Sequence, residues 1–316
     1  MRLLVAATTA LFLTIGLAGC LDDPTGTVAV EGGGSLAVGR LEVFPFNLVA
    51  GMTYGAATPW GTLVRLANPT SEATNFEFFL EGGQGWVADA RALAVDGDDA
   101  KQGDLFLDGR LAGGESTVVL VHLDDIGDGN LTMTVEQGSA RLEYTFGLAE
   151  AGSNLVEPGH SVETFTVGVW INGTSFYTNW GAFHEAPGFP RGYPAGDFGG
   201  DPLPIYVYDD DRAEQPPRSK DNCEFTTITG YNELLKMQQL GASAVRFLEP
   251  EEAYTVPGAE DHFLYGEPLI FLNYVVGHGG DTVPITGDLP QPLAPCFHPN
   301  NALPPGVPPL PIPGAS

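Results

Sequence analysis

The feature that most restricts the fold of this chain is the alternation of apolar and polar residues over about residues 41–150. In the segment NLTMTVEQG, Leu131, Met133 and Val135 point one way along an extended chain, and the residues between them point the other way. The segment ARLEYTFGL repeats the pattern. A period of two is typical of a strand with one buried face, whereas an amphipathic helix needs a period of 3.6. We therefore expect strands here and no helix.

Four further stretches of this region fit strands separated by glycine- and aspartate-rich turns, namely Val64–Leu66, Phe76–Leu80, Leu105–Leu107 and Val118–Leu123. Short alternating strands at near-regular spacing favour an antiparallel β-sandwich. The segment NPTSEATNFEFFL is similar to the immunoglobulin-like (Ig-like) modules of secreted prokaryotic proteins, a resemblance that covers architecture only. We expect an all-β, Ig-like sandwich over residues 41–150.

The first twenty residues, MRLLVAATTALFLTIGLAGC, place the basic Arg2 before an apolar run that is short for a membrane span. The ending Leu-Ala-Gly-Cys resembles the lipobox of prokaryotic lipoproteins, in which the cysteine is lipidated. We expect residues 1–19 to be a lipoprotein signal peptide and Cys20 to carry lipid. The protein would then be extracytoplasmic and anchored to the cell membrane. An ordinary signal peptide with an incidental cysteine is the alternative.

Charge narrows the choice of partners. The chain has 40 acidic and 13 basic residues, a formal net charge of −27. Nucleic-acid affinity depends on Lys and Arg neutralising phosphates, so nucleic-acid binding is not expected. Docking on an anionic lipid surface also needs some other anchor, such as the lipid on Cys20. Hydrophobic residues at 43% and charged residues at 17% describe a folded globular protein.

Both ends of the chain differ in composition from its middle. The glycine-rich residues 20–40 are expected to form a flexible tether. The proline-rich residues 278–316 are expected to be an extended tail. Cys223 and Cys296 make an even pair in an oxidising compartment and are expected to form a disulfide, with two free thiols as the alternative.

The segment TGYNELLKMQQLGASAVRFLEPEEAYTVPG predicts one short helix in an otherwise β-rich chain. Tyr231, Leu234 and Leu235 follow helical spacing, and Gly241 supplies a left-handed stop. A strand over Ala242–Leu248 follows, and Pro250 ends it. One helix packed on a sheet of alternating strands is an α+β arrangement.

This segment, followed by HFLYGEPLIFLNYVV, resembles the C-terminal half of FK506-binding-protein type (FKBP) peptidyl-prolyl isomerases. Upstream, PGHSVETFTVGVWINGTSFYTN is similar to the first hairpin of that family. The likeness covers about 120 residues. It implies an FKBP-like domain over residues 155–277, in which a curled antiparallel sheet wraps on one short helix. The implied activity is peptidyl-prolyl cis-trans isomerisation, and the implied partners are proline-containing segments of exported proteins.

The resemblance also implies site residues. The catalytic positions would be Tyr254, a hydrogen-bonding tyrosine, Phe176 of the hairpin, and Tyr231 in place of a tryptophan on the pocket floor. The remaining substrate-binding positions would be Tyr177, Ile205, Thr227, Ile228, His262, Phe263 and Phe271. Such a site desolvates and twists an amide, so it needs no cofactor and no metal.

Three departures from the family pattern bear on activity. Thr166 stands where the family has a tyrosine, Tyr177 replaces an aspartate at the rim, and Arg246 lies at a strand position that is usually apolar. A prolyl isomerase or folding helper is the leading interpretation. A non-catalytic peptide- or protein-binding lipoprotein with the same fold is the alternative, and a purely structural surface protein is a third.

Overall fold

A computed structural model describes residues 36–46, 53–54, 59–150, 155–157, 161–179, 188–190, 192, 203–206, 229–236, 238–255, 260, 263–278 and 281–282. The expected signal peptide and the three cysteines, Cys20, Cys223 and Cys296, lie outside these residues. So do most of the expected tether and tail.

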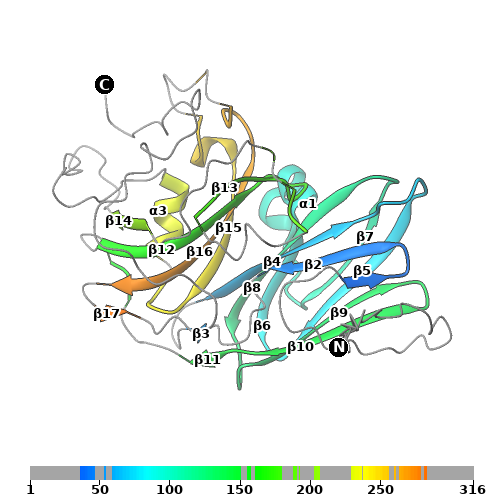
Figure 1. Ribbon diagram of the computed structural model, residues 1–316, viewed down its shortest axis with the longest axis horizontal. Coiled ribbons are helices and arrows are strands. Elements are labelled where there is room, and N and C mark those ends of the chain that lie inside the picture. The colour runs from blue at the N-terminus through cyan, green and yellow to red at the C-terminus, as the bar shows by residue number, and fades with distance from the viewer. Residues whose placement is uncertain are drawn as a thin grey trace, which may run out of the picture.

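The N-terminal part of the chain forms two packed antiparallel sheets (Figure 1). The first sheet has the order β1 (Leu36–Val38), β2 (Leu41–Phe46), β4 (Trp60–Ala67), β8 (Ser116–Asp125) and β6 (Gln84–Asp89). The second has the order β10 (Ala140–Gly147), β9 (Asn130–Gln137), β5 (Thr74–Glu81) and β7 (Phe106–Leu111). A short parallel pair joins β3 (Thr53–Tyr54) to β11 (Ala149–Glu150).

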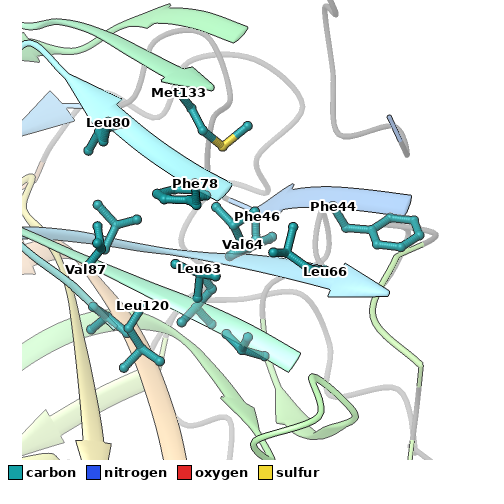
Figure 2. Close-up of a cluster of buried hydrophobic side chains, with 14 of the residues drawn as sticks. Phe44, Phe46, Leu63, Val64, Leu66, Phe78, Leu80, Val87, Leu120 and Met133 are labelled. Atoms are coloured by element: carbon teal, nitrogen blue, oxygen red, sulfur yellow. The ribbon is translucent and has the colours of Figure 1, made fainter. Parts of the chain in front are cut away.

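Period-two alternation accounts for the inner strands of the second sheet, β9 and β5. On β9, Leu131, Met133 and Val135 are at most 1% exposed, and on β5 Phe76 and Phe78 are equally buried. Their side chains fill the space between the two sheets, as Figure 2 shows for Phe78 and Met133. The predicted sandwich architecture, two packed antiparallel sheets, is confirmed.

Two expectations for this region are wrong. A helix, α1 (Ala90–Asp96), and a 3-10 turn, η1 (Gly97–Ala100), follow β6 directly. Seven residues are too few to reveal a 3.6-residue period. Asp89 is a residue type that favours the N-cap position, and its side chain does accept a hydrogen bond from the Arg91 backbone N–H. Leu36–Val38, expected within the flexible tether, pairs with β2 as strand β1.

The second part of the chain is an antiparallel sheet that carries a single short helix, α3 (Thr229–Lys236). The strand order is β13 (Ser175–Thr178), β12 (Ser161–Val169), β16 (Leu269–His278) and β15 (Ser243–Leu248). Strand β14 (Leu203–Tyr206) pairs with β12, and β17 (Asp281–Thr282) pairs with β16. The predicted fold class, all-β followed by α+β, is therefore confirmed.

Boundaries differ from expectation around the helix and at the end of the sheet. The described helix ends at Lys236, and Gly241 takes its positive φ of 81° in the turn before β15. There the Gly241 N–H donates a hydrogen bond to the Val275 carbonyl over 2.8 Å. Strand β16 continues through His278 and β17 pairs with it, so the sheet extends beyond residue 277.

The sheet of the second part is buried on both faces. Along β12, Thr164 and Thr166 face α3, while Phe165, Val167 and Val169 belong to the same apolar core as the sandwich. Strand alternation thus divides β12 between two different cores.

The first sheet of the sandwich is the central layer of the molecule. Every residue of β4 except Arg65, and the run Thr117–Leu123 of β8, is buried, so both faces of these strands are covered. In Figure 2, Leu63 and Leu120 lie on the opposite side of this sheet from Met133. The Ser243 hydroxyl donates to the Gly61 carbonyl over 2.9 Å, and a Cβ on Gly61 would lie 2.6 Å from the Val245 nitrogen. The two parts of the chain therefore share one apolar core.

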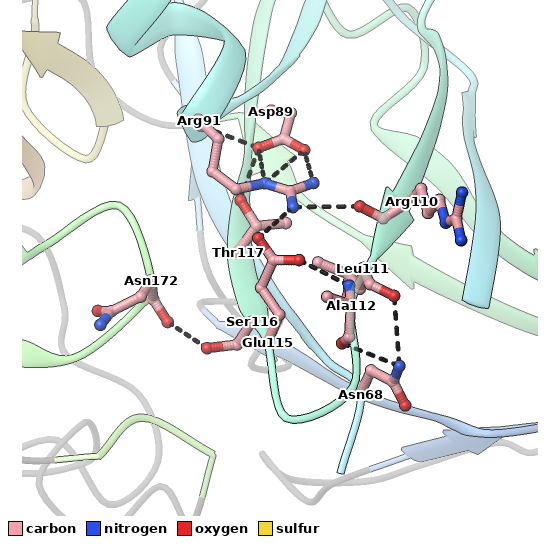
Figure 3. Close-up of polar contacts among 10 residues, drawn as sticks. All are labelled: Asn68, Asp89, Arg91, Arg110, Leu111, Ala112, Glu115, Ser116, Thr117 and Asn172. Carbon is pink, nitrogen blue, oxygen red and sulfur yellow. Dashed lines mark hydrogen bonds and ion pairs between the residues drawn. The ribbon is translucent and has the colours of Figure 1, made fainter. Parts of the chain in front are cut away.

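We call the contact between the sandwich and the sheet of the second part the seam. At the turn between β12 and β13, polar groups hydrogen-bond across it. The Ser116 hydroxyl donates to the Asn172 carbonyl over 2.8 Å (Figure 3). The Arg65 Nε–H donates to the same carbonyl over 3.2 Å. The Val118 N–H donates to the Ile171 carbonyl over 3.2 Å. These bonds hold the β12–β13 hairpin against the sandwich.

The sandwich side of this seam is itself braced. Arg91 forms ion pairs with Asp89 and Glu115 at 2.5 and 2.8 Å, and Asp89 also accepts from the Thr117 hydroxyl at 2.6 Å (Figure 3). These contacts fix the start of β8. The hairpin that carries Phe176 therefore contacts a part of β8 that is itself held by ion pairs and hydrogen bonds.

Candidate functional site

The hairpin between β12 and β13 positions Phe176, the first of the predicted aromatic site residues. Its turn is closed by two backbone bonds, from the Trp170 N–H to the Thr174 carbonyl at 2.9 Å and from the Gly173 N–H to the Trp170 carbonyl at 2.8 Å. The Phe176 ring then lies directly over Gly168, where any Cβ would be 2.5 Å from the ring. Gly168 is therefore required for Phe176 to reach this position.

Three of the predicted aromatic rings form one edge-to-face series. The Phe271 ring of β16 lies 5.5 Å from the Phe176 ring at 83°, and 5.3 Å from the Tyr231 ring of α3 at 77°. Tyr254, which follows the 3-10 turn η3 (Pro250–Glu252), belongs to the same buried cluster. Edge-to-face packing stabilises aromatic pairs by about 0.5–1.5 kcal/mol beyond burial. We call these four residues the aromatic cluster.

The outer rim of the cluster is more accessible than its interior. The four clustered rings are at most 5% exposed, but Phe263 is 38% exposed, and Trp170 and Tyr177 are half-buried. The Trp170 ring lies edge-to-face on Phe176 at 5.1 Å and on Phe263 at 6.4 Å. We call Trp170, Tyr177 and Phe263 the aromatic rim.

Sequence reasoning missed Trp170. Its signal was the period-two register of β12, because Thr164, Thr166, Gly168 and Trp170 all fall on the side that faces α3. The residues on that side define the floor and rim of the candidate site.

The tyrosines of the site are neutral hydrogen-bond donors. Burial raises the pKa of Tyr231 to about 12, against the opposing effect of hydrogen bonds with Thr164 and Thr166. Burial also raises the pKa values of Tyr254 and Tyr177, and the neighbouring Tyr231 adds to both shifts. All three hydroxyls stay protonated throughout the physiological range. Any chemistry that they support is therefore independent of pH there.

A buried polar network holds the Tyr231 hydroxyl. That hydroxyl donates to Asn273 Oδ1 over 2.6 Å, and Asn273 Nδ2 donates to Gln238 Oε1 over 2.6 Å. Gln238 Nε2 in turn donates to the backbone carbonyls of Ala242 and Asn273, over 3.1 and 3.0 Å. The Thr166 hydroxyl completes the network against Tyr231 and Asn273. Thr166, a departure from the family pattern, is therefore a buried partner of Tyr231.

Arg246 also has a structural explanation. Its Nη2 forms an ion pair with Glu252 Oε1 at 2.5 Å. Glu252 ends η3, two residues before Tyr254. The pair thus braces the corner that carries Tyr254, which explains a charged residue at a strand position expected to be apolar.

The structure brings together Tyr254, Phe176, Tyr231 and Phe271, and it places Tyr177 and Phe263 at their rim. The remaining predicted residues are Ile205, Thr227, Ile228 and His262. The backbone of Ile205 pairs with Val162, and its side chain is outside the described set. Thr227, Ile228 and His262 lie outside the described residues.

Metal-binding groups and membrane-spanning helices are both absent from the described residues. Among these residues, no group of three or more His, Cys, Asp or Glu side chains is placed to hold a metal ion. Within the same ranges, every helix falls short of the length and apolarity that crossing a membrane demands.

Comparison with known proteins adds little. No family model matches the chain, and no curated protein matches it. Among solved structures, the chain is similar to the ASH/PapD-like domain of human CEP192 (PapD-like domain 7). The identity is 12%, the match covers 46% of this chain and 100% of that one, and the TM-score is 0.21. A likeness at this level supports no conclusion about function.

Proposed function

We propose that this protein binds proline-containing segments of exported proteins at the aromatic cluster and catalyses cis-trans isomerisation of their X-Pro bonds. The observation that carries the proposal is the convergence of Phe176, Tyr231, Tyr254 and Phe271. These residues come from a hairpin, a helix, a 3-10 corner and a closing strand that are far apart in the sequence. The resemblance of these segments to FKBP isomerases supports the same assignment.

The chemistry requires only positioning and desolvation. Rotation about an X-Pro bond faces a barrier of about 20 kcal/mol, which arises from amide resonance. Apolar surroundings favour the twisted amide, because it carries less charge separation than the planar form. A neutral tyrosine hydroxyl then donates to a flanking carbonyl. Tyr254 is the candidate for that donor, because the resemblance to FKBP isomerases puts their hydrogen-bonding tyrosine at this position and the residue lies in the aromatic cluster.

One observation favours a second candidate, peptide binding without catalysis. The four rings of the cluster are at most 5% exposed, whereas at the rim Phe263 is 38% exposed and Trp170 and Tyr177 are half-buried. A segment bound on the rim alone gains apolar contact without having its amide enclosed. Binding then occurs without acceleration.

A protease-coupled isomerisation assay on the full chain, with several X-Pro substrates, separates the two candidates. We expect acceleration that Phe176→Ala reduces at least tenfold in kcat/KM, because the variant removes one wall of the cluster. The matched control is Phe79→Ala, which removes one ring of the Phe79–Phe106 pair on the sandwich, whose centroids are 4.8 Å apart.

Tyr254→Phe keeps the ring and removes only the hydroxyl, so it tests the donor role even where Phe176→Ala lowers stability. We expect it to lower kcat with little change in KM. Peptide binding without acceleration in the unaltered chain would support the second candidate. Absence of both binding and acceleration would reject both.

We also propose that the protein is anchored outside the cytoplasm by lipid on Cys20. The support is the Leu-Ala-Gly-Cys sequence at the end of the apolar leader. Cys20→Ser is expected to move the protein from the membrane fraction to the soluble fraction, as measured by fractionation and immunoblotting. Cys223→Ser, a matched control, should leave the distribution unchanged. Membrane association that survives Cys20→Ser would contradict the lipid anchor.

A further inference from the structure

The aromatic rim suits a proline-rich ligand. Phe263 is 38% exposed and its ring lies edge-to-face with that of Trp170, while Trp170 and Tyr177 are half-buried and both pack on the aromatic cluster. Proline-rich segments in the polyproline II conformation dock on surfaces of this kind, because pyrrolidine rings pack on aromatic faces and the segment is already extended. The occupant of such a surface needs proline and few charges.

The end of the same chain has this composition. Of the 34 residues that follow Thr282, 11 are proline, and residues 303–313 read LPPGVPPLPIP. After Asp288 the sequence contains no Asp, Glu, Lys or Arg, although the whole chain carries a formal net charge of −27. An uncharged segment approaches this acidic molecule without the repulsion that another acidic segment would meet.

Chain length allows this segment to reach the rim. Strand β16 runs antiparallel to β12 and leaves the sheet beside Val162, whereas Trp170 follows the other end of β12. Eight residues of strand separate the two ends, a span of about 26 Å at 3.3 Å per residue. Leu303 follows Thr282 by 21 positions (303 − 282), and a random-coil chain of that length has an r.m.s. end-to-end distance of about 25 Å.

A linker whose r.m.s. length matches the span gives the largest effective concentration, of the order of 1 mM. We infer that residues 303–313 bind the aromatic rim of their own molecule and compete there with outside proline-containing segments. This inference rests on the proposed peptide-binding function and adds a built-in competitor to it. Residues 303–313 thereby set a minimum affinity for the rim. An outside segment that binds the rim more weakly than this does not displace them.

The test measures the affinity of three forms of the protein for a fluorescent peptide of sequence LPPGVPPLPIP, by fluorescence anisotropy. The first is the unaltered chain, and the second ends at Ala302. The third, a matched control, keeps the full length but replaces the six prolines of residues 303–313 with serine. For a peptide that binds the open rim with a Kd of about 0.1 mM, competition at about 1 mM predicts roughly tenfold tighter binding by the second and third proteins.

A second set of variants locates the contact. In the chain ending at Ala302, Trp170→Ala is expected to abolish most of the peptide binding, and Phe79→Ala to leave it unchanged. If binding by the shortened chain equals that of the unaltered chain, the tail does not occupy the rim, and the proposed function stands. If none of the proteins binds this or any other X-Pro peptide, the proposed function fails and the inference with it.

A tail from a second molecule is the other possible occupant, and concentration separates the two. Competition within one molecule is independent of protein concentration, whereas competition between molecules grows with it. Peptide affinity of the unaltered chain that is constant across a hundredfold range of protein concentration supports binding in cis. Affinity that weakens as the protein is concentrated, together with self-association in sedimentation, would overturn it.

Discussion

Residues 155–282 expressed without the sandwich are expected to aggregate instead of folding. One whole face of their sheet is apolar and is covered by the sandwich in the intact chain. The buried side chains on that face are Phe165, Val167, Val169, Val245, Ile270, Leu272, Tyr274 and Val276. Full burial of such a side chain contributes about 1.5–3 kcal/mol, so losing eight of them removes more than about 10 kcal/mol, as much as a domain's whole stability.

The measurement is the yield of soluble protein, followed by urea unfolding of any soluble fraction, with the full chain as reference. The full chain should unfold in a single transition, since the two parts share one core. A soluble monomer of residues 155–282 that unfolds cooperatively would show that the seam is not needed for folding.

Gly61→Ala tests the same seam with a single methyl group. A Cβ at this position would lie 2.6 Å from the backbone nitrogen of Val245, so β4 and β15 must separate. Overpacking of this kind costs about 1–3 kcal/mol. Gly103→Ala is the matched control, because the nearest atom to its Cβ would be 3.9 Å away. Equal stability of the two variants would argue against close packing at the seam.

Asn273→Leu is expected to lower the free energy of unfolding by about 3–5 kcal/mol, the second large effect. The variant leaves the buried Gln238 Oε1 without its donor and removes Asn273 Oδ1, the acceptor shared by the hydroxyls of Tyr231 and Thr166, which keep only their contact with each other and the weaker one with Thr164. Each buried polar group left unsatisfied costs about 1–3 kcal/mol. Asn75→Leu, at an exposed position of β5, is the control and should change stability by less than about 0.5 kcal/mol.

Combining Asn273→Leu with Tyr231→Phe gives a double-mutant cycle for the network. Because both variants remove the same hydrogen bond, the double variant should be less destabilised than the sum of the two single variants. Additive losses would show that Asn273 and Tyr231 do not interact in solution. Urea unfolding monitored by circular dichroism provides all the required values.

Local features were readable from the sequence where one physical signal dominated. Alternation identified the strands around Leu131 and Phe78, because each has one buried and one exposed face. Helical spacing identified α3 through Leu234 and Leu235. The helix α1 was missed because seven residues span barely two turns, and β1 was missed because its three residues sit among glycines.

Part of the candidate site could also be predicted from the sequence, because the resemblance to FKBP isomerases assigns a role to individual positions. It predicted Phe176, Tyr231, Tyr254 and Phe271, which the structure places in one cluster. It did not predict Trp170, which belongs to the rim, nor the role of Asn273 beneath Tyr231. The register of β12 places Trp170 on the side of Thr164 and Thr166, but the contact of Trp170 with Phe263 and that of Asn273 with Tyr231 depend on which segments meet in the fold, and no local pattern encodes that.

The sequence by itself determined the succession of strands, the single helix on the second sheet and the residues able to form an aromatic cluster. Local propensity and period are sufficient for these, since each depends on neighbours a few positions apart. Only the tertiary structure decided that β4 and β8 are buried on both faces and that the two parts share one core. Alternation disappears from a strand covered on both sides, and the covering partner is chosen by contacts such as Gly61 with Val245, 184 positions apart in the chain (245 − 61).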